Sequence, residues 1–241
     1  MMISIIVPTL NEEKYLSLLL ESIKKQDFFD YEIIVADAGS KDKTIEIAAK
    51  YNCRVVPGGL PAKGRNEGAK KAKGDLLLFI DADSVLPEGF LTKSLEEFNR
   101  RGLDFASFGL MPIEGPKINK IVFNMFYNWY IYTLEKALPH AAMGILAKKD
   151  LFLILNGYDE TIKLAEDHDL GRRAGKIASY GIIKSVKVYF SDRRFKKDGW
   201  LKTAGRYLLC ELHMIFIGPV RTNMFEYKFD HYSKDKKATK K

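Results

Sequence analysis

Two aspartates end a short apolar run in the first third of the chain. Residues 77–84 read LLFIDADS, so Asp81 and Asp83 directly follow a segment that fits a strand buried on both faces. In an extended chain, residues two apart point the same way, so both carboxylates can converge on one hard divalent cation. Ligands of open α/β sheets bind at the carboxyl ends of the strands. The pair predicts a site for a hard divalent cation that would bind a phosphate, with a solvated acidic turn as the alternative.

A second acidic cluster lies in the last third of the chain. Residues 165–170 read AEDHDL, and Arg172 and Arg173 follow. A carboxylate within hydrogen-bond reach of a hydroxyl can take its proton as the oxygen attacks, so Asp167 is a candidate general base. The alternative is an acidic first turn that complements a helix dipole.

These clusters need a scaffold, and the chain alternates strand and helix patterns. Period-2 and period-3.6 patterns predict strands at 3–7, 31–36, 54–56 and 77–80, helices at 12–25, 42–51 and 65–73, and a loop at 57–64. Repeated β-α-β units predict a mostly parallel sheet with helices on both faces. The polar segments 8–12, 37–40 and 81–83 then fall on one edge of the sheet.

Composition limits the class of protein. The chain has 241 residues, 46% hydrophobic and 29% charged, which fits a globular protein and excludes wholesale disorder. The two cysteines, Cys53 and Cys210, form no disulfide framework, and with no leader peptide visible we expect a cytoplasmic location. The net charge of +8 suits an anionic partner: nucleic acid, an acidic membrane surface or a phosphorylated substrate.

Four segments together resemble the family 2 glycosyltransferases of the GT-A fold, over roughly residues 3–195. They read IIVPTLNEEKYL, VADAGSKDKT, GRNEGAKKAKGDLLLFIDADS and NGYDETIKLAEDHDLGRR. The resemblance implies an α/β, Rossmann-like fold with a mostly parallel central sheet and helices on both faces. It also implies a UDP- or GDP-sugar donor, a divalent cation, and direct attack on the anomeric carbon with inversion of configuration.

The resemblance also assigns roles to individual residues. It implies a nucleoside pocket lined by Pro8, Thr9, Asn11 and Glu12, with Asp37 on the base. It implies that Asp81 faces the ribose and contributes to the metal site, and that Asp83 ligates the metal.

Further positions match the catalytic and phosphate-binding parts of the family pattern. Asp167, with Glu166 beside it, matches the base, and Lys63 and Arg65 place positive charge near the diphosphate. Arg193 and Arg194 resemble a basic pair that holds the diphosphate or a phosphorylated acceptor.

One departure from the family pattern concerns the metal. Many relatives carry a further histidine ligand after the strand that follows the acidic helix, whereas this chain reads VYFSDRRF at 188–195. Either Asp192 or water would then complete the metal shell, or the cation would be held mainly by Asp83 and the diphosphate, as Mg²⁺ allows. Of the four histidines, His168 lies inside the acidic motif and is a candidate to modulate the base, whereas His140, His213 and His231 have no ligand spacing between them. The sequence predicts no zinc site.

Two amphipathic segments are candidates for the part of the protein that binds the acceptor. Residues 118–138 are rich in aromatic side chains but too short in uncharged length to span a bilayer, and residues 200–217 form a helix pattern with a basic face. Each fits either a membrane interface or packing over the sheet. With the Lys-rich tail at 234–241, expected to be disordered, they favour peripheral contact with the cytoplasmic face of an anionic membrane.

The sequence therefore predicts a donor lobe at 1–110, an acceptor lobe at 111–198 and a helical extension at 199–241. The leading hypothesis is transfer of a sugar to a hydroxyl of a glycan or lipid-linked acceptor. Transfer to a polyprenyl (dolichyl) phosphate is the alternative, because that acceptor is already anionic and needs no base. A non-catalytic, basic nucleotide- or nucleic-acid-binding protein is the alternative from another class, although no nucleic-acid-binding motif is present.

Overall fold

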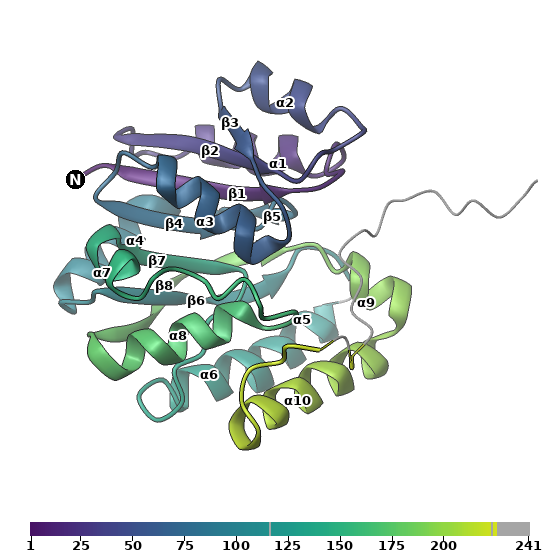
Figure 1. The fold of residues 1–241 in the computed structure, drawn as a ribbon. Coiled ribbons are helices and arrows are strands. Elements are labelled where there is room, and N and C mark those ends of the chain that lie inside the picture. Colours follow the sequence, from purple (N-terminus) through teal and green to yellow (C-terminus); the bar gives the residue numbers. More distant parts are fainter. Residues whose placement is uncertain (116, 223, 226–241) are drawn as a thin grey trace, which may run out of the picture.

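A single mixed sheet forms the centre of the molecule, in a computed structural model that describes residues 1–115, 117–222 and 224–225 (Figure 1). The strand order is β3-β2-β1-β4-β7-β6-β8-β5. The strands are β1 Ile3–Thr9, β2 Tyr31–Asp37, β3 Arg54–Pro57, β4 Leu76–Ile80, β5 Ser84–Val85, β6 Phe105–Pro112, β7 Gly144–Lys148 and β8 Tyr180–Phe190.

Strands and helices alternate one by one as far as β4, and helices predominate later in the chain. They are α1 Leu16–Lys24, α2 Thr44–Lys50, α3 Pro61–Lys71, α4 Phe90–Arg100, α5 Lys117–Phe123, the π-helix η1 Asn124–Asn128, α6 Trp129–Thr133, α7 Lys149–Ile154, α8 Glu166–Ile177, α9 Arg193–Asp198 and α10 Trp200–Phe216.

Strand direction brings the polar segments to one edge. β3, β2, β1 and β4 pair in parallel, β7 is antiparallel to both β4 and β6, and β8 is parallel to β6. β1, β2, β4 and β8 therefore share a direction, and their carboxyl ends lie along the same edge. The segments that follow these strands begin at Leu10, Ala38, Asp81 and Ser191.

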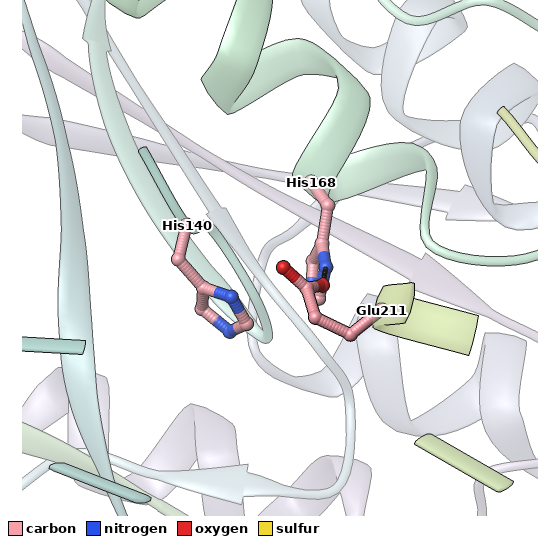
Figure 2. A group of neighbouring side chains, drawn as sticks. All are labelled: His140, His168 and Glu211. Atoms are coloured by element: carbon pink, nitrogen blue, oxygen red, sulfur yellow. Dashed lines mark hydrogen bonds and ion pairs between the residues drawn. The ribbon is translucent and has the colours of Figure 1, made fainter. Parts of the chain in front are cut away.

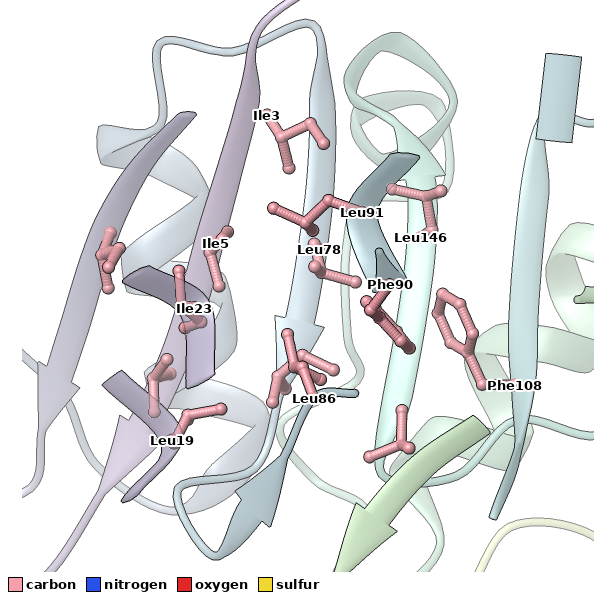
Figure 3. Packing of buried hydrophobic residues seen from close by; sticks show 14 of the residues in the cluster. Ile3, Ile5, Leu19, Ile23, Leu78, Leu86, Phe90, Leu91, Phe108 and Leu146 are labelled. Carbon is pink, nitrogen blue, oxygen red and sulfur yellow. The ribbon is translucent and has the colours of Figure 1, made fainter. Parts of the chain in front are cut away.

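The apolar side chains divide between the two faces of the sheet. Ile3, Ile5 and Val7 alternate onto one face, where they pack with α1 and α4; Figure 3 shows part of this core. Ile6 points to the other face, which α3, α7 and α8 cover. α3 lies so close to β1 that a Cβ on Gly68 would overlap the Ile6 side chain. This contact fixes the helix that carries Arg65.

Two local differences from the sequence prediction affect the site. α3 begins at Pro61, in the segment predicted to be a loop, because proline is well suited to the first helical turn. Lys63 therefore lies on the same helix as Arg65 rather than in a loop. Residues 118–138 are interrupted by the π-helix η1 and do not form one regular helix.

The outward faces of the two amphipathic segments are apolar. Exposed side chains on α5, η1 and α6 include Ile118, Ile121, Met125, Phe126 and Trp129, and those on and just after α10 include Leu208, Leu209, Leu212, Ile215, Phe216 and Ile217. On α10 the side predicted to be polar is turned inward, since Thr203 and Cys210 are buried. In the described part of the chain, no helix combines the length and hydrophobicity needed to cross a membrane.

The predicted lobes share the sheet, because β8 pairs with both β6 and β5. The division into lobes stays a prediction. The tail at 234–241 lies outside the described residues.

Candidate active site

Arg65 lies at the centre of a buried cluster of carboxylates. Its guanidinium is 2.7 Å from Asp81, 2.7 Å from Glu166 and 3.5 Å from Asp167, and the residue is only 4% exposed. These contacts join α3 and the segment after β4 to the first turn of α8, where Glu166 lies 101 positions after Arg65. The two acidic motifs of the sequence therefore meet at one cation.

Asp167 has an altered acidity in this cluster. Burial raises the pKa of Asp167 to about 7; Arg65 opposes the shift, whereas Glu166 and Asp81 add to it. Burial also raises the pKa of Tyr158 well above its ordinary value, with the Asp167 charge adding to the effect, so the phenol stays protonated. The Tyr158 ring lies 5.3 Å from the Arg65 guanidinium. A carboxyl group with a pKa near neutrality suits proton transfer.

The start of α8 is held by its surroundings. Ala165 precedes Glu166 with a left-handed φ of 62°, which is costly for a residue other than glycine. Arg173 pairs with Asp169 and donates to the carbonyls of Leu155 and Gly157. Asn66 of α3 exchanges two hydrogen bonds with the Tyr158 backbone. α3 and α8 are thus both tied to the segment 155–158.

Arg193 forms a second ion-pair centre at the same edge. It makes a bidentate pair with Glu12 at 2.7 and 2.8 Å, and its Nε lies 3.1 Å from Asp83. Burial raises the pKa of Glu12, while Arg193 opposes that shift. The segment after β8 reaches this position because the Ser191 N–H donates to the Asp83 carbonyl.

The segments after β1 and β2 are joined by hydrogen bonds. Asp37 accepts from the Thr9 hydroxyl, the Ser40 hydroxyl and the Gly39 and Ser40 N–H groups. Asn11 has a left-handed φ of 56°; its N–H donates to Ser40 and its side chain accepts from the Lys41 N–H. Both oxygens of Asp37 are already used in this loop.

The donor set at the edge fits a hard divalent cation. Asp81 and Asp83 supply carboxylate oxygens, and each now faces a guanidinium, from Arg65 and Arg193 respectively, so the site already accommodates positive charge. Asp192 is 1% exposed, and its Oδ2 has no partner among the described residues. A buried carboxylate oxygen without a partner, directly after β8, fits the expectation that Asp192 completes the shell.

The predicted residues are not all brought together. Pro8 lies in β1 beside Gly64 of α3, whereas Lys63 is exposed on α3. The side chain of Arg194 lies outside what the structure describes. Sequence reasoning missed the contact of Tyr158 with Arg65 and the role of Ser40 at Asp37; the turn pattern around Tyr158 was the available signal.

Comparison with known proteins gives one family. The model of the family described as Glycosyl transferase family 2 matches residues 4–141. The poly(ribitol-phosphate) beta-N-acetylglucosaminyltransferase TarS of Staphylococcus aureus is 29% identical over 207 residues, 79% of this chain and 35% of that protein. The minor teichoic acid biosynthesis protein GgaB of Bacillus subtilis is 29% identical over 213 residues, 81% of this chain and 23% of that protein. The chain thus spans about a third or less of these relatives.

Solved structures share the fold. TarS residues 1–349 from S. aureus, in complex with UDP-GlcNAc, superpose with a TM-score of 0.66 at 24% identity, covering 96% of this chain and 77% of that one. The mannosyltransferase PcManGT from Pyrobaculum calidifontis, with GDP-Man and Mn²⁺, gives 0.68 at 19% identity, covering 86% and 61%. The predicted α/β fold of GT-A type is confirmed.

Proposed function

Because the chain belongs to glycosyl transferase family 2, we propose that it moves a sugar from a UDP- or GDP-sugar to a hydroxyl of a glycan or lipid-linked acceptor, inverting the anomeric carbon. That it is a glycosyltransferase sets aside the non-catalytic, nucleic-acid-binding alternative. The observation that supports the proposal is the Arg65 cluster, which joins the donor motif at Asp81 to the base motif at Asp167. TarS, solved with UDP-GlcNAc, supports a nucleotide-sugar donor.

Asp167 is the proposed base. Its pKa of about 7 means that a large fraction is ionised at neutral pH, while the group is still basic enough to accept a proton from an attacking hydroxyl. Glu166, paired with Arg65, keeps the first turn of α8 in place.

The donor would lie along the carboxyl ends of β1, β2 and β4. Pro8, Thr9, Asn11 and Glu12 would line the nucleoside pocket and Asp37 would contact the base. Mg²⁺ or Mn²⁺ held by Asp83 and Asp81 would stabilise the charge of the departing nucleoside diphosphate as a Lewis acid. Arg193, now bound to Glu12 and Asp83, is close enough to this edge to exchange a carboxylate for a diphosphate oxygen, with Lys63 and Arg194 as further cations.

Replacing Asp167 by Asn tests the proposal. Loss of a general base costs roughly 10²–10⁴-fold in rate, so we expect Asp167→Asn to lose transfer while retaining UDP or GDP binding. Asp169→Asn is the matched control, because Asp169 lies in the same turn but pairs with Arg173. A mild loss in Asp167→Asn would instead indicate an acceptor that is already anionic, such as a polyprenyl phosphate. Wild-type protein that hydrolyses or transfers no nucleotide sugar would contradict the proposal as a whole.

We also propose that the outward faces of α5, η1, α6 and α10 contact an anionic membrane surface. Eleven large apolar side chains are exposed there, and Figure 1 shows α6 and α10 on the same side of the molecule. Lys136, Lys197 and Lys202 are exposed on or next to these helices, which suits acidic headgroups. Apolar side chains with nearby lysines are typical of helices that lie in a membrane interface.

Flotation with lipid vesicles tests the membrane contact. We expect the protein to float with phosphatidylglycerol-containing vesicles and to bind pure phosphatidylcholine vesicles more weakly. The double variant Phe126→Ser and Trp129→Ser should lose flotation, whereas Phe29→Ser, which changes an even more exposed aromatic ring before β2, should not. Equal flotation of both variants would overturn the proposal.

A further inference from the structure

Two histidines and a glutamate form a cluster beside the proposed base. His140 comes from the segment before β7, His168 from the first turn of α8 and Glu211 from α10, and Figure 2 shows the three side chains gathered at one point. One donor atom from each residue lies within 4.8 Å of the other two. The His168 Nδ1 is 2.8 Å from the Glu211 Oε2, and the centroids of the two imidazole rings are 4.0 Å apart. The fold thus unites histidines whose sequence spacing indicates no metal site.

His140 has an unused nitrogen in this cluster. The residue is 6% exposed; its Nε2 lies 2.9 Å from the Tyr127 hydroxyl, and its Nδ1 has no partner among the described residues. Burial lowers the pKa of His140 well below its ordinary value, and the neighbouring His168 lowers it further, so the imidazole stays neutral. A buried polar atom without a partner requires an explanation, and a neutral imidazole nitrogen offers a lone pair.

The surrounding residues resemble the supporting shell of a metal site. Histidine ligands usually have their second ring nitrogen hydrogen-bonded, and ligating carboxylates are bonded in turn. The Tyr127 hydroxyl is the hydrogen-bond partner of the second ring nitrogen of His140. Arg172 is the partner of the carboxylate, since its Nη2 donates to the Glu211 Oε1 at 2.8 Å and leaves Oε2 for the cluster.

We propose that His140, His168 and Glu211 bind one divalent transition-metal ion of the zinc type, with water as the fourth ligand. Two imidazoles and one carboxylate suit such an ion better than Mg²⁺ or Mn²⁺, which prefer oxygen ligands. Around a tetrahedral ion, bonds of about 2.0–2.2 Å place the donor atoms roughly 3.3–3.5 Å apart. The His168 Nδ1 and the Glu211 oxygen, now 2.8 Å apart, must therefore separate slightly, whereas donor atoms that lie farther apart, up to 4.8 Å, must approach one another. The ion takes the place of the proton shared by His168 and Glu211.

The bound ion joins α10 to α8 next to Asp167. The C-terminal helix, which carries part of the exposed apolar face, is thereby fixed to the turn that holds the proposed base. This inference does not depend on the proposed glycosyl transfer, because it concerns binding of the metal alone.

Zinc titration of the full chain tests the proposal. The protein is stripped with a chelator and titrated with Zn²⁺ by calorimetry in an Asp83→Asn background, which weakens the oxygen-ligand site. We expect one Zn²⁺ per chain, at least 100-fold weaker binding in His168→Asn and Glu211→Gln, and roughly 10–100-fold weaker binding in Tyr127→Phe. Co²⁺ in place of Zn²⁺ should give the visible absorption bands of a tetrahedral site.

His213→Asn is the matched control. His213 also lies on α10, but its Nδ1 contacts the Gly218 carbonyl rather than the cluster, so its removal should leave zinc affinity unchanged. Circular dichroism identifies variants that fail to fold, and Tyr127→Phe retains the ring and its packing. Zinc affinity that is equal in wild type, His168→Asn and Tyr127→Phe would overturn the proposal. So would a folded wild-type chain that binds no Zn²⁺.

Discussion

The burial of Asp167 should make both the transfer rate and the stability of the protein depend on pH. Its folded-state pKa of about 7 lies above its ordinary value of 3.8, so the base form is lost as the pH falls below neutrality. We expect kcat/KM for transfer to rise between pH 6 and pH 8 and then level off. A rate that stays flat over this interval in wild type would contradict the assignment of Asp167.

The raised pKa of Asp167 also affects the free energy of unfolding of the protein. Because the folded state holds the Asp167 proton more tightly than the unfolded state, this group lowers the free energy of unfolding as the pH rises from about 4 to about 7. Asp167→Asn removes that penalty, so the variant should be more stable than wild type at pH 8 and gain less at pH 4. Urea denaturation at the two pH values measures the difference.

Arg65 is expected to hold the cluster together. Removing one partner of a buried ion pair leaves uncompensated charge, which typically costs about 3–5 kcal/mol. Arg65→Gln should therefore lower the free energy of unfolding by roughly 3 kcal/mol at pH 7. Lys63→Gln, two residues away on the exposed side of α3, should change it by less than about 0.5 kcal/mol. Chemical denaturation of both variants distinguishes the two positions.

At the scale of residues, the sequence did not predict which side chains meet when they lie far apart in the chain. The segments 8–12, 37–40 and 81–83 could be placed on one edge, because each follows a predicted parallel strand. The pairing of His168 with Glu211 could not be predicted, since it depends on where α10 packs. The burial of Arg65 was also not predicted, because its partner Glu166 lies 101 positions later in the chain.

At the scale of elements, the π-helix η1 places one asparagine, Asn128, against the edge of β6. β6 pairs with β7 only through Ser107, so the backbone of Leu110 has no strand partner on that side. The Asn128 amide accepts from the Leu110 N–H at 2.9 Å and donates to the Leu110 carbonyl at 2.8 Å. The wide π-turn carries Asn128 to this position, where it is 1% exposed.

Asn128→Leu tests this role. The substitution leaves two buried backbone groups without partners, each at a cost of about 1–3 kcal/mol, so we expect a loss of roughly 2–5 kcal/mol of stability. Asn124→Leu is the comparison variant. Asn124 lies one turn earlier and accepts from the Asn128 amide and from Lys187, so it supports Leu110 only through Asn128, and its replacement should cost less stability. Thermal unfolding that is the same for both variants would show that Asn128 does not complete the strand edge.

The β-α-β units of the first hundred residues follow local patterns, and the predicted strands agree with β1 to β4 within two residues. The second half was harder to predict, because its helices are set by tertiary contacts. The hydrophobic wheel of 200–217 identified two faces, but the buried side is the one with Thr203 and Cys210. Periodicity finds an amphipathic face and does not say which neighbour covers it.

At the scale of the whole molecule, metal and nucleotide should stabilise the fold together. A ligand that binds only the folded state raises stability by RT ln(1 + [L]/Kd). We expect UDP or GDP with Mn²⁺ to raise the Tm more than either component alone, and chelation to abolish transfer. Asp83→Asn should remove the synergy and leave any zinc-dependent shift intact. Equal shifts with and without Mn²⁺ would contradict the proposed donor site.

The pairing of β5 with β8 has a consequence for synthesis on the ribosome. Ser84 and Val85, next to the acidic pair at 81–83, find their partners Phe190 and Tyr189 more than a hundred positions later. At typical elongation rates, the ribosome needs roughly 5–20 s to supply them. During that interval the nascent chain displays an acidic loop without its basic counterpart, Arg193. Premature termination before β8 would therefore release a polypeptide with most of its sheet but without the ion pairs that Arg193 makes with Glu12 and Asp83.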